Sequence, residues 1–177
     1  NCYDCFEMSE PDCVIHTIGM LHDDHHAPEK SLAQMDKDWF LKSMEINTYS
    51  LVETAQALYQ HTTKDSATKL IAFSARVSSI TDNHLGGWHS YRMSKSALNM
   101  LIKNIALEWK FSRKKSTVIG WHPGTVDTDI TAPFKARVKP EKLFTPEQAA
   151  QYLLSFLSSL SVSHSGNTYT WEHKVLE

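Results

Sequence analysis

The chain has 177 residues, of which 41% are hydrophobic and 21% charged, and its formal net charge at pH 7 is -2. This composition is typical of one folded domain with a proper core, and it excludes a disordered chain. The small net charge offers no basic surface to nucleic acid or to an anionic membrane. No apolar run approaches the roughly 20 residues of a membrane span. We therefore expect a cytoplasmic protein whose partner is a small molecule or another protein.

All three cysteines, Cys2, Cys5 and Cys13, lie near the amino end of the chain. An odd number of cysteines without a secretory signal predicts reduced thiols. A zinc site remains an alternative, built either from Cys2 and Cys5 with His16 or from the three cysteines with residues 22–26. The second pair of ligands for a structural zinc is not at a recognisable spacing, so we expect no metal.

The first strand and the first helix frame a polar loop. Residues 13–19 are apolar and β-branched, which predicts a strand buried on both faces of a parallel sheet. Residues 20–28 follow at its carboxyl end, where open α/β sheets bind their ligands. Apolar periodicity over residues 36–61 predicts a long helix capped by Asp36. Asn47 falls in its middle, where an asparagine is either exposed or a buried group with a specific partner.

The middle of the chain continues this alternation. Residues 69–75 predict a second buried strand, and a polar segment that contains Ser78 and Ser79 follows it. From residue 91 to about residue 111, apolar side chains recur at three- and four-residue steps, which predicts an amphipathic helix. Residues 117–121 predict a third strand, from which the chain turns sharply over residues 122–128.

The last part of the chain contains an irregular segment, a helix and a strand. Residues 129–143 include two prolines, and long irregular segments beside a site are commonly lids. A helix-start signature over residues 145–148 predicts a helix that reaches about residue 159. Residues 167–171 predict the last strand. This alternation of strands and helices predicts an α/β domain with a parallel sheet and right-handed crossovers.

Tyr91 and Lys95 form the first candidate functional pair. Residues four apart on a helix share one face, so both side chains point into the same space. An ammonium group close to a phenol favours the phenolate, which predicts a lowered pKa for Tyr91 and a role in proton transfer. The same spacing occurs in ordinary exposed helix pairs. The surrounding residues therefore decide between the two interpretations.

Four segments together resemble the short-chain dehydrogenase/reductase superfamily, and most closely its C-factor-like branch. They are residues 82–88, 91–99, 122–128 and 19–24. The resemblance covers nearly the whole chain from about residue 12. It implies a three-layer α/β/α Rossmann-type fold, of which this chain contains about four strands. It also implies hydride transfer between a nicotinamide cofactor, NADP or NAD, and a small-molecule carbonyl or alcohol.

The resemblance implies a role for each matching residue. Tyr91 would give a proton to the carbonyl oxygen in reduction or take one from the alcohol in oxidation. Lys95 would lower the pKa of Tyr91 and bind the ribose hydroxyls of the cofactor, while Asn47 would support a water relay to Lys95. Gly19 matches the family's close-approach glycine. The residues that would hold the nicotinamide carboxamide are Pro123, Gly124, Val126 and Thr128.

The serine that orients the substrate carbonyl in the family is a point of departure. It usually belongs to a Ser-Ser pair at the end of the second predicted strand, where this chain has Ser74 and Ala75. Ser79 and Ser78 lie 12 and 13 residues before Tyr91, close to the family's spacing. We choose Ser79, although loop serines also cap turns, and Ser78 and Ser74 remain alternatives.

The cofactor's phosphate site is the larger departure. The family binds the pyrophosphate with a glycine-rich strand-to-helix turn and reads the adenine ribose with a residue that follows. The chain has six glycines and none in that arrangement. We therefore expect a single, amino-terminally incomplete domain over residues 1–177, lacking the first three strands. Residues 13–19 would then form an unpaired edge, and the choice between NAD and NADP cannot be read.

A non-catalytic binding or signalling module derived from the superfamily is the alternative to an enzyme. Ala75, His16 in place of the family's asparagine and the missing phosphate turn favour the module. Tyr91, Lys95 and Asn47 favour the enzyme. In either case the resemblance implies a homodimer, because the family's two long helices commonly pack against their copies. The substrate is not named by the sequence, since loops vary freely on one scaffold.

Overall fold

A four-stranded parallel sheet forms the centre of the protein. The computed structural model describes residues 10–113 and 115–177. Its sheet contains β1 (Cys13–His16), β2 (Lys69–Phe73), β3 (Thr117–His122) and β6 (Thr168–Thr170) in the spatial order β1-β2-β3-β6. All three pairings are parallel. The four predicted strands are confirmed; β1, β2 and β6 are shorter than predicted, and β3 extends one residue further, to His122.

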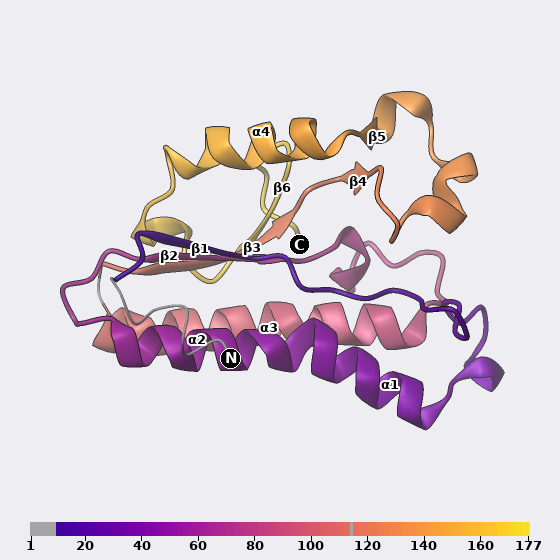
Figure 1. Cartoon of the computed structure of the whole chain (residues 1–177), viewed down its shortest axis with the longest axis horizontal. Coiled ribbons are helices and arrows are strands. Elements are labelled where there is room, and N and C mark those ends of the chain that lie inside the picture. The colour runs from indigo at the N-terminus through magenta and orange to yellow at the C-terminus, as the bar shows by residue number, and fades with distance from the viewer. Residues whose placement is uncertain (1–9, 114) are drawn as a thin grey trace.

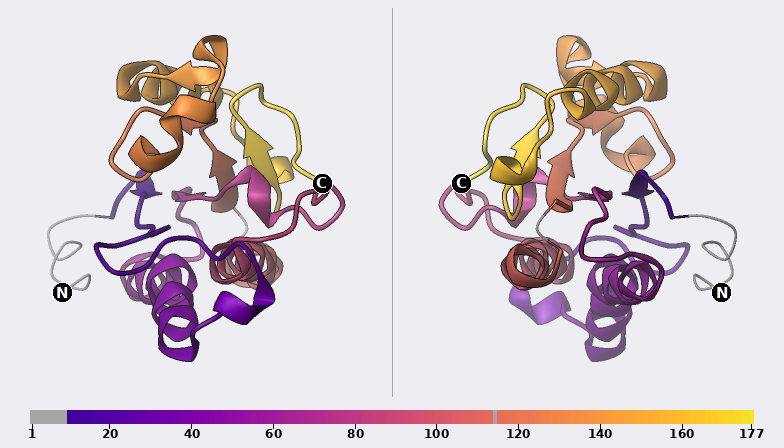
Figure 2. Two further views of the ribbon diagram at one scale, coloured as in Figure 1. Left: turned by 90° about the vertical axis from the view of Figure 1, so that its right-hand side faces the viewer. Right: turned by 90° about the vertical axis from the view of Figure 1, so that its left-hand side faces the viewer.

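Helices cover both faces of this sheet, which confirms the three-layer prediction. One face carries α1 (Lys37–Met44), α2 (Ser50–His61) and α3 (His89–Ser112), and the opposite face carries α4 (Pro146–Leu157) (Figure 1). Both end-on views show the sheet between these two layers (Figure 2). The arrangement is that of a Rossmann-type α/β/α sandwich.

The predicted long helix over residues 36–61 contains an irregularity that the sequence pattern does not predict. Its start is as expected, because the carboxylate of Asp36 accepts a hydrogen bond from the backbone N–H of Trp39 at 2.8 Å. Between α1 and α2, however, residues Glu45–Tyr49 form a π-helical turn. Such turns are rare and are frequent at functional sites. Asn47 lies in this turn and is fully buried.

The segment between β3 and α4 is ordered by short elements. The strands β4 (Thr125–Val126) and β5 (Leu143–Phe144) pair in parallel, and 3₁₀ turns occupy Ala132–Arg137 and Pro140–Lys142. The predicted helix start is confirmed, since Thr145 and Gln148 exchange side-chain-to-backbone hydrogen bonds of 3.2 and 2.9 Å in a capping box.

Two apolar cores, one on each face of the sheet, hold the layers together. The larger core packs α2 and α3 against β2 and β3, and the smaller core packs α4 against the opposite face of β2, β3 and β6. The larger core is made by Leu51, Leu58, Leu70, Ala72, Leu98, Ile102, Ile105, Ala106, Trp109 and Val118. Because α3 packs on this core from Leu98 to Trp109, the body of the helix is held against the sheet.

The first strand differs from its prediction. Residues 13–19 were expected to be buried on both faces, but β1 ends at His16, and both Cys13 and Ile15 are exposed. Ile18, beyond the strand, is also 47% exposed. Within residues 10–113 and 115–177, β1 pairs with β2 alone. An apolar pattern cannot tell a central strand from an edge strand, and among the described residues β1 is an edge strand of the sheet.

Candidate functional site

The candidate site lies where the carboxyl ends of β1, β2 and β3 meet the start of α3. In Figure 1 this is the right-hand end of the molecule, and the left panel of Figure 2 looks onto it. Parallel strands all present their carboxyl ends at one edge of a sheet. This topology brings together the loop after β1, the loop after β2 and the turn after β3, which are distant in sequence.

Lys95 is the charged centre of the site. Its side chain is 2% exposed, and its Nζ donates a hydrogen bond of 2.8 Å to the backbone oxygen of Phe73 at the end of β2. Burial lowers the pKa of Lys95 to about 8. Gly19 lies against it, because a Cβ built on Gly19 would be 3.3 Å from Nζ. The site thus holds a lysine that loses its proton more readily than a lysine in water.

Tyr91 precedes Lys95 by one helical turn, and its pKa differs from the predicted direction. Burial raises the pKa of Tyr91 to about 12, whereas the sequence argument expected Lys95 to lower it. The physical reason is that the buried phenolate would lose its hydration, while the Lys95 ammonium donates to the Phe73 carbonyl. In this state Tyr91 is therefore a neutral phenol that holds its proton at neutral pH.

Asn47 connects three segments of the site through its side-chain amide. Its Oδ1 accepts from the backbone N–H of Met20 at 2.7 Å, and its Nδ2 donates to the Met20 carbonyl at 2.9 Å. Nδ2 also donates to Oγ of Ser94 at 3.0 Å, and Ser94 in turn donates to the Tyr91 carbonyl at 2.9 Å. Of the two alternatives for this residue, a buried group with specific partners is confirmed. Its part in a water relay to Lys95 remains a prediction.

The three candidate serines are all engaged in hydrogen bonds. Ser79 accepts from the backbone N–H of Asp82 at 3.0 Å and contacts the Thr81 hydroxyl at 3.1 Å. Ser78 donates to the Ala75 carbonyl, and Ser74 donates to Asn99. Only the Ser79 hydroxyl proton is not committed to a carbonyl or an amide oxygen.

Asn99 is a site residue to which the sequence argument assigned no role. Its Oδ1 accepts from Ser74 at 2.7 Å and from Thr168 at 3.0 Å, and its Nδ2 donates to Ser78 at 2.7 Å. The side chain therefore joins α3 to the residue that follows β2 and to the first residue of β6. Its spacing of eight residues from Tyr91, about two helical turns, is the only sequence signal that places it on the site face.

The turn after β3 has the strained geometry that its glycine predicts. Gly124 has a φ of +83°, and a Cβ there would collide with the ring of Phe144. Thr131 then fixes the backbone that follows, since its hydroxyl donates to the carbonyls of Val126 and Thr128. That Pro123, Gly124, Val126 and Thr128 contact a nicotinamide remains a prediction.

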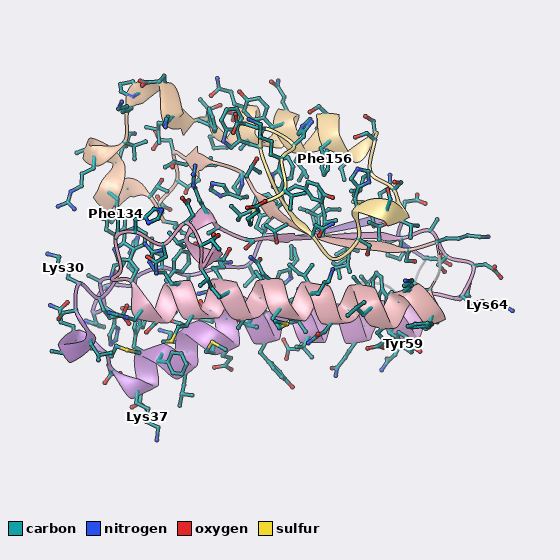
Figure 3. The ribbon with its side chains drawn as sticks, turned by 180° about the vertical axis from the view of Figure 1, so that it is seen from behind. Lys30, Lys37, Tyr59, Lys64, Phe134 and Phe156 are labelled. Atoms are coloured by element: carbon teal, nitrogen blue, oxygen red, sulfur yellow. The ribbon has the colours of Figure 1, made fainter. Side chains whose placement is uncertain are left out.

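The segment between β4 and β5 packs over the start of α3. Phe134 lies 5.0 Å, centroid to centroid, from Trp88, which in turn lies 6.3 Å from Tyr91. Nε2 of His22 lies 3.1 Å from the backbone oxygen of Ile130. Figure 3 shows Phe134 at this end of the molecule. A cavity of about 280 Å³ between the two segments is lined by His22, Asp23, Asp24, His25, His26, Ala27, Pro28, Pro133 and Phe134.

His16 is a second residue whose role at the site was not predicted. Its Nε2 lies 3.1 Å from the Ser50 hydroxyl and its Nδ1 lies 3.2 Å from the Thr54 hydroxyl, so the ring links β1 to α2. Burial, with a smaller contribution from the charge of Lys95, lowers the pKa of His16 to about 4. The ring is therefore neutral in the folded protein at neutral pH.

Comparison with known proteins decides the family. A family model described as enoyl-(acyl carrier protein) reductase matches residues 7–171. The chain belongs to the short-chain dehydrogenase/reductase superfamily. The chain is 32% identical over 155 residues to 1-hydroxy-2-glutathionyl-2-methyl-3-butene dehydrogenase of Rhodococcus sp. (strain AD45). The match covers 88% of the chain and 63% of that enzyme. The family resemblance drawn from the sequence is confirmed.

Two further relatives extend the comparison. The C-signal of Myxococcus xanthus is 22% identical over 142 residues, which cover 80% of each chain. NADPH-bound carbonyl reductase from chicken fatty liver shares the fold, with a TM-score of 0.80 and 23% identity, over 97% of this chain and 68% of its own. The chain spans 63% of the Rhodococcus enzyme and 55% of an uncharacterized oxidoreductase of Schizosaccharomyces pombe.

The metal alternatives gain no support in the described part of this dehydrogenase/reductase chain. Cys2 and Cys5 lie outside the described residues. Within residues 10–113 and 115–177, no three His, Cys, Asp or Glu side chains are grouped to hold a metal ion. His26 instead stacks on Trp39 and contacts Asp23, which also binds Lys42 at 3.0 Å. Among the same residues, no helix is long and apolar enough to cross a membrane.

The Asn47 contacts lead to a stability prediction. Asn47→Ala leaves the backbone groups of Met20 and the hydroxyl of Ser94 without their buried partner, so we expect the free energy of unfolding to fall by at least about 2 kcal/mol. Asn104→Ala, at an exposed position on α3, should change it by no more than about 0.5 kcal/mol. Urea unfolding measures both. Equal effects of the two substitutions would show that the Asn47 contacts contribute nothing.

The lowered pKa of His16 leads to a pH prediction. The unfolded chain binds a proton at His16 below about pH 6.5, but the folded chain does so only near pH 4. Stability is therefore lost as the pH falls through this range. We expect His16→Asn to remove about 1 to 3 kcal/mol of this loss between pH 7 and pH 4. Urea unfolding at several pH values tests this, with exposed His84→Asn as the control; a wild-type pH dependence in His16→Asn would contradict it.

Proposed function

We propose that this chain carries the reaction site of an NAD(P)-dependent oxidoreductase that transfers hydride between a nicotinamide and a small-molecule carbonyl or alcohol. The observation that carries the proposal is the continuous set of hydrogen bonds from the Met20 backbone through Asn47 and Ser94 to the Tyr91 carbonyl, with Lys95 buried on the same helix. A buried lysine one helical turn from a half-buried tyrosine is costly to keep, so a site that uses the lysine is the best explanation.

The residues present fit the nicotinamide end of the cofactor. Gly19 leaves open the space beside Lys95 that a side chain would fill, and this lets a ribose approach its ammonium group. The turn at Pro123 and Gly124 would hold the nicotinamide carboxamide, together with Val126 and Thr128. When bound, the nicotinamide would supply or accept the hydride.

The pKa values favour the reductive direction. Because the pKa of Tyr91 is about 12, its phenol is protonated at neutral pH and has a proton to give to a carbonyl oxygen. Lys95, with a pKa of about 8, bears a positive charge in most molecules at neutral pH and stabilises the phenolate that proton donation leaves behind. Ser79 is the proposed orienting donor, since its hydroxyl proton is not bound to a carbonyl oxygen.

The non-catalytic module is not favoured. Its sequence support was Ala75, His16 and the missing phosphate turn, and of these His16 has a structural role between β1 and α2. Several of the relatives are named as dehydrogenases or reductases. We keep the cytoplasm as the proposed location because the odd number of cysteines predicts reduced thiols, and Cys13, the cysteine in the described part of the chain, is free.

Activity of the full-length protein tests the proposal. We expect NADPH or NADH oxidation with a panel of aldehydes and ketones, and Tyr91→Phe should lower kcat by at least about 100-fold. Lys95→Ala should raise the cofactor Kd by about 10-fold or more, because it removes charged hydrogen bonds. Nicotinamide fluorescence measures the Kd.

Two matched controls lie at the opposite end of the molecule. Tyr59→Phe and Lys64→Ala make the same chemical changes far from the site (Figure 3), and both should leave kcat and Kd unchanged. If no cofactor binds at millimolar concentration and no carbonyl is reduced, the oxidoreductase proposal fails and a repurposed module remains.

We also propose that the protein is a homodimer through the helical face formed by α1, α2 and α3. Met93, Met100 and Leu107 recur every seven residues on α3, so they share one face, and they are 42%, 62% and 51% exposed. Beside them, a nearly apolar hollow of about 380 Å³ is lined by Met44, Glu45, Thr48, Tyr49, Val52 and Leu101. Contiguous apolar surface of this kind is typical of interfaces.

Light scattering tests the dimer. The full-length protein should have twice the mass of one chain, and Met100→Glu combined with Leu107→Glu should halve it, because charges would be buried at the interface. Leu154→Glu, at a 61% exposed position on α4, places a charge on the opposite layer and should leave the dimer intact. A wild-type protein with the mass of one chain would exclude the dimer.

A further inference from the structure

Glu29 is a buried carboxylate that the proposed chemistry does not use. It lies in the loop after β1 and is 3% exposed. Both of its carboxylate oxygens lie 3.3 Å from the backbone nitrogen of Ser90, and Oε1 also accepts from the Ser90 hydroxyl. Ser90 itself is completely buried and immediately precedes Tyr91 in the first turn of α3.

The backbone of Glu29 holds the entry to the same helix. Its carbonyl accepts from the backbone N–H of Trp88 at 2.5 Å. Gly86, Gly87 and Trp88 are three consecutive residues with positive φ, at 64°, 64° and 52°. A Cβ on Gly87 would lie only 3.2 Å from the Glu29 carbonyl oxygen. The chain thus enters α3 through a strained turn that is packed directly against Glu29.

The residues at the start of α3 supply no side-chain N-cap of their own, and Glu29 takes that role. Trp88 occupies the N-cap position of α3 and makes no side-chain capping hydrogen bond. The first N–H groups of a helix need acceptors, and its amino end favours a negative charge. A Ser or Asp at position 88 would meet both needs without burying a carboxylate from another loop. Among the described residues, no cation pairs with Glu29.

The position of Lys95 does not depend on the contact between Glu29 and Ser90. Lys95 lies one turn further into α3 and is fixed independently by the Phe73 carbonyl and by its packing against Gly19. Tyr91 lies in the first turn, where helix ends fray unless they are capped. A clamp on Ser90 therefore fixes the backbone of Tyr91 without being needed for Lys95.

We propose that Glu29 is a positioning residue for Tyr91, whose carboxylate clamps Ser90 and thereby sets the tyrosine against the substrate carbonyl. The catalytic part of this inference rests on the proposed oxidoreductase function, and the clamp itself does not. A displacement of about 1 Å at a reacting group lowers a rate by up to about 100-fold. The clamp predicts that its loss lowers kcat and leaves cofactor binding alone.

The first arm of the test measures the clamp without any catalysis. Hydrogen–deuterium exchange of the full-length protein is compared for wild type, Glu29→Ala, Glu29→Gln and the exposed control Glu53→Gln. Loss of a helix cap should speed exchange over residues 88–92 by about fivefold or more in Glu29→Ala. Glu29→Gln keeps one acceptor and should show a smaller increase, while Glu53→Gln should match wild type. Wild-type exchange in Glu29→Ala would overturn the clamp.

The second arm measures its consequence for the reaction. Glu29→Ala should lower kcat by about 10-fold or more, with the Kd for NADPH unchanged and the protein fully folded by circular dichroism. Ser90→Ala removes the other partner, so the double variant with Glu29→Ala should be little worse than Glu29→Ala alone. A wild-type kcat, or an NADPH Kd raised as much as kcat is lowered, would overturn the positioning role.

The two arms keep the two hypotheses apart. If the wild-type protein reduces no carbonyl, the proposed function fails, and the exchange arm still decides whether Glu29 clamps Ser90. If the wild type is active and exchange is unchanged in Glu29→Ala, the clamp fails and the proposed function stands.

Discussion

The side-chain amide of Asn47 is the interaction on which the rest of the site depends. It satisfies both backbone groups of Met20 and reaches Ser94 on α3, so three segments that are distant in sequence are held in one geometry. An alanine or a charged residue could not offer both a donor and an acceptor in that place. The π-helical turn at Glu45–Tyr49 is what brings the amide inward, at the cost of regular helix geometry. Gly19 then lies beside Lys95, where a Cβ would be 3.3 Å from Nζ.

Burial, rather than pairwise charge, sets the chemistry of this site. Lys95 and Tyr91 lie on one helix face, and burial favours the neutral form of each. It lowers the pKa of Lys95 to about 8 and raises the pKa of Tyr91 to about 12. The same desolvation keeps His16 neutral. The protonated phenol can donate to a carbonyl oxygen, and the positive charge that Lys95 still bears in most molecules at neutral pH stabilises the phenolate that remains. The four-residue spacing correctly predicted that the two residues share a helix face, but the predicted lowering of the Tyr91 pKa by Lys95 was wrong, because burial raises it.

The start of α3 shows how the fold concentrates strain and support at one point. The long helix α3 packs on the larger apolar core. Its Asn99 also bonds Ser74, which follows β2, and Thr168, which begins β6. Its first turn has no local cap, and it follows three residues with positive φ. The loop after β1 supplies the missing acceptor through Glu29. Phe134, from the segment between β4 and β5, packs against Trp88 at the same helix start, so elements from three parts of the chain meet there.

The four strands of the main sheet, the main helices and the family could be predicted from the sequence. Apolar periodicity, the Asp36 cap and the Thr145 capping box depend on residues a few positions apart, so they can be read from a linear pattern. The π-helical turn, the partners of Asn47, the exposure of β1 and the contact between Glu29 and Ser90 could not. Each of these depends on segments that meet only when the sheet forms, and a side chain's burial, hence its pKa, is fixed by that meeting.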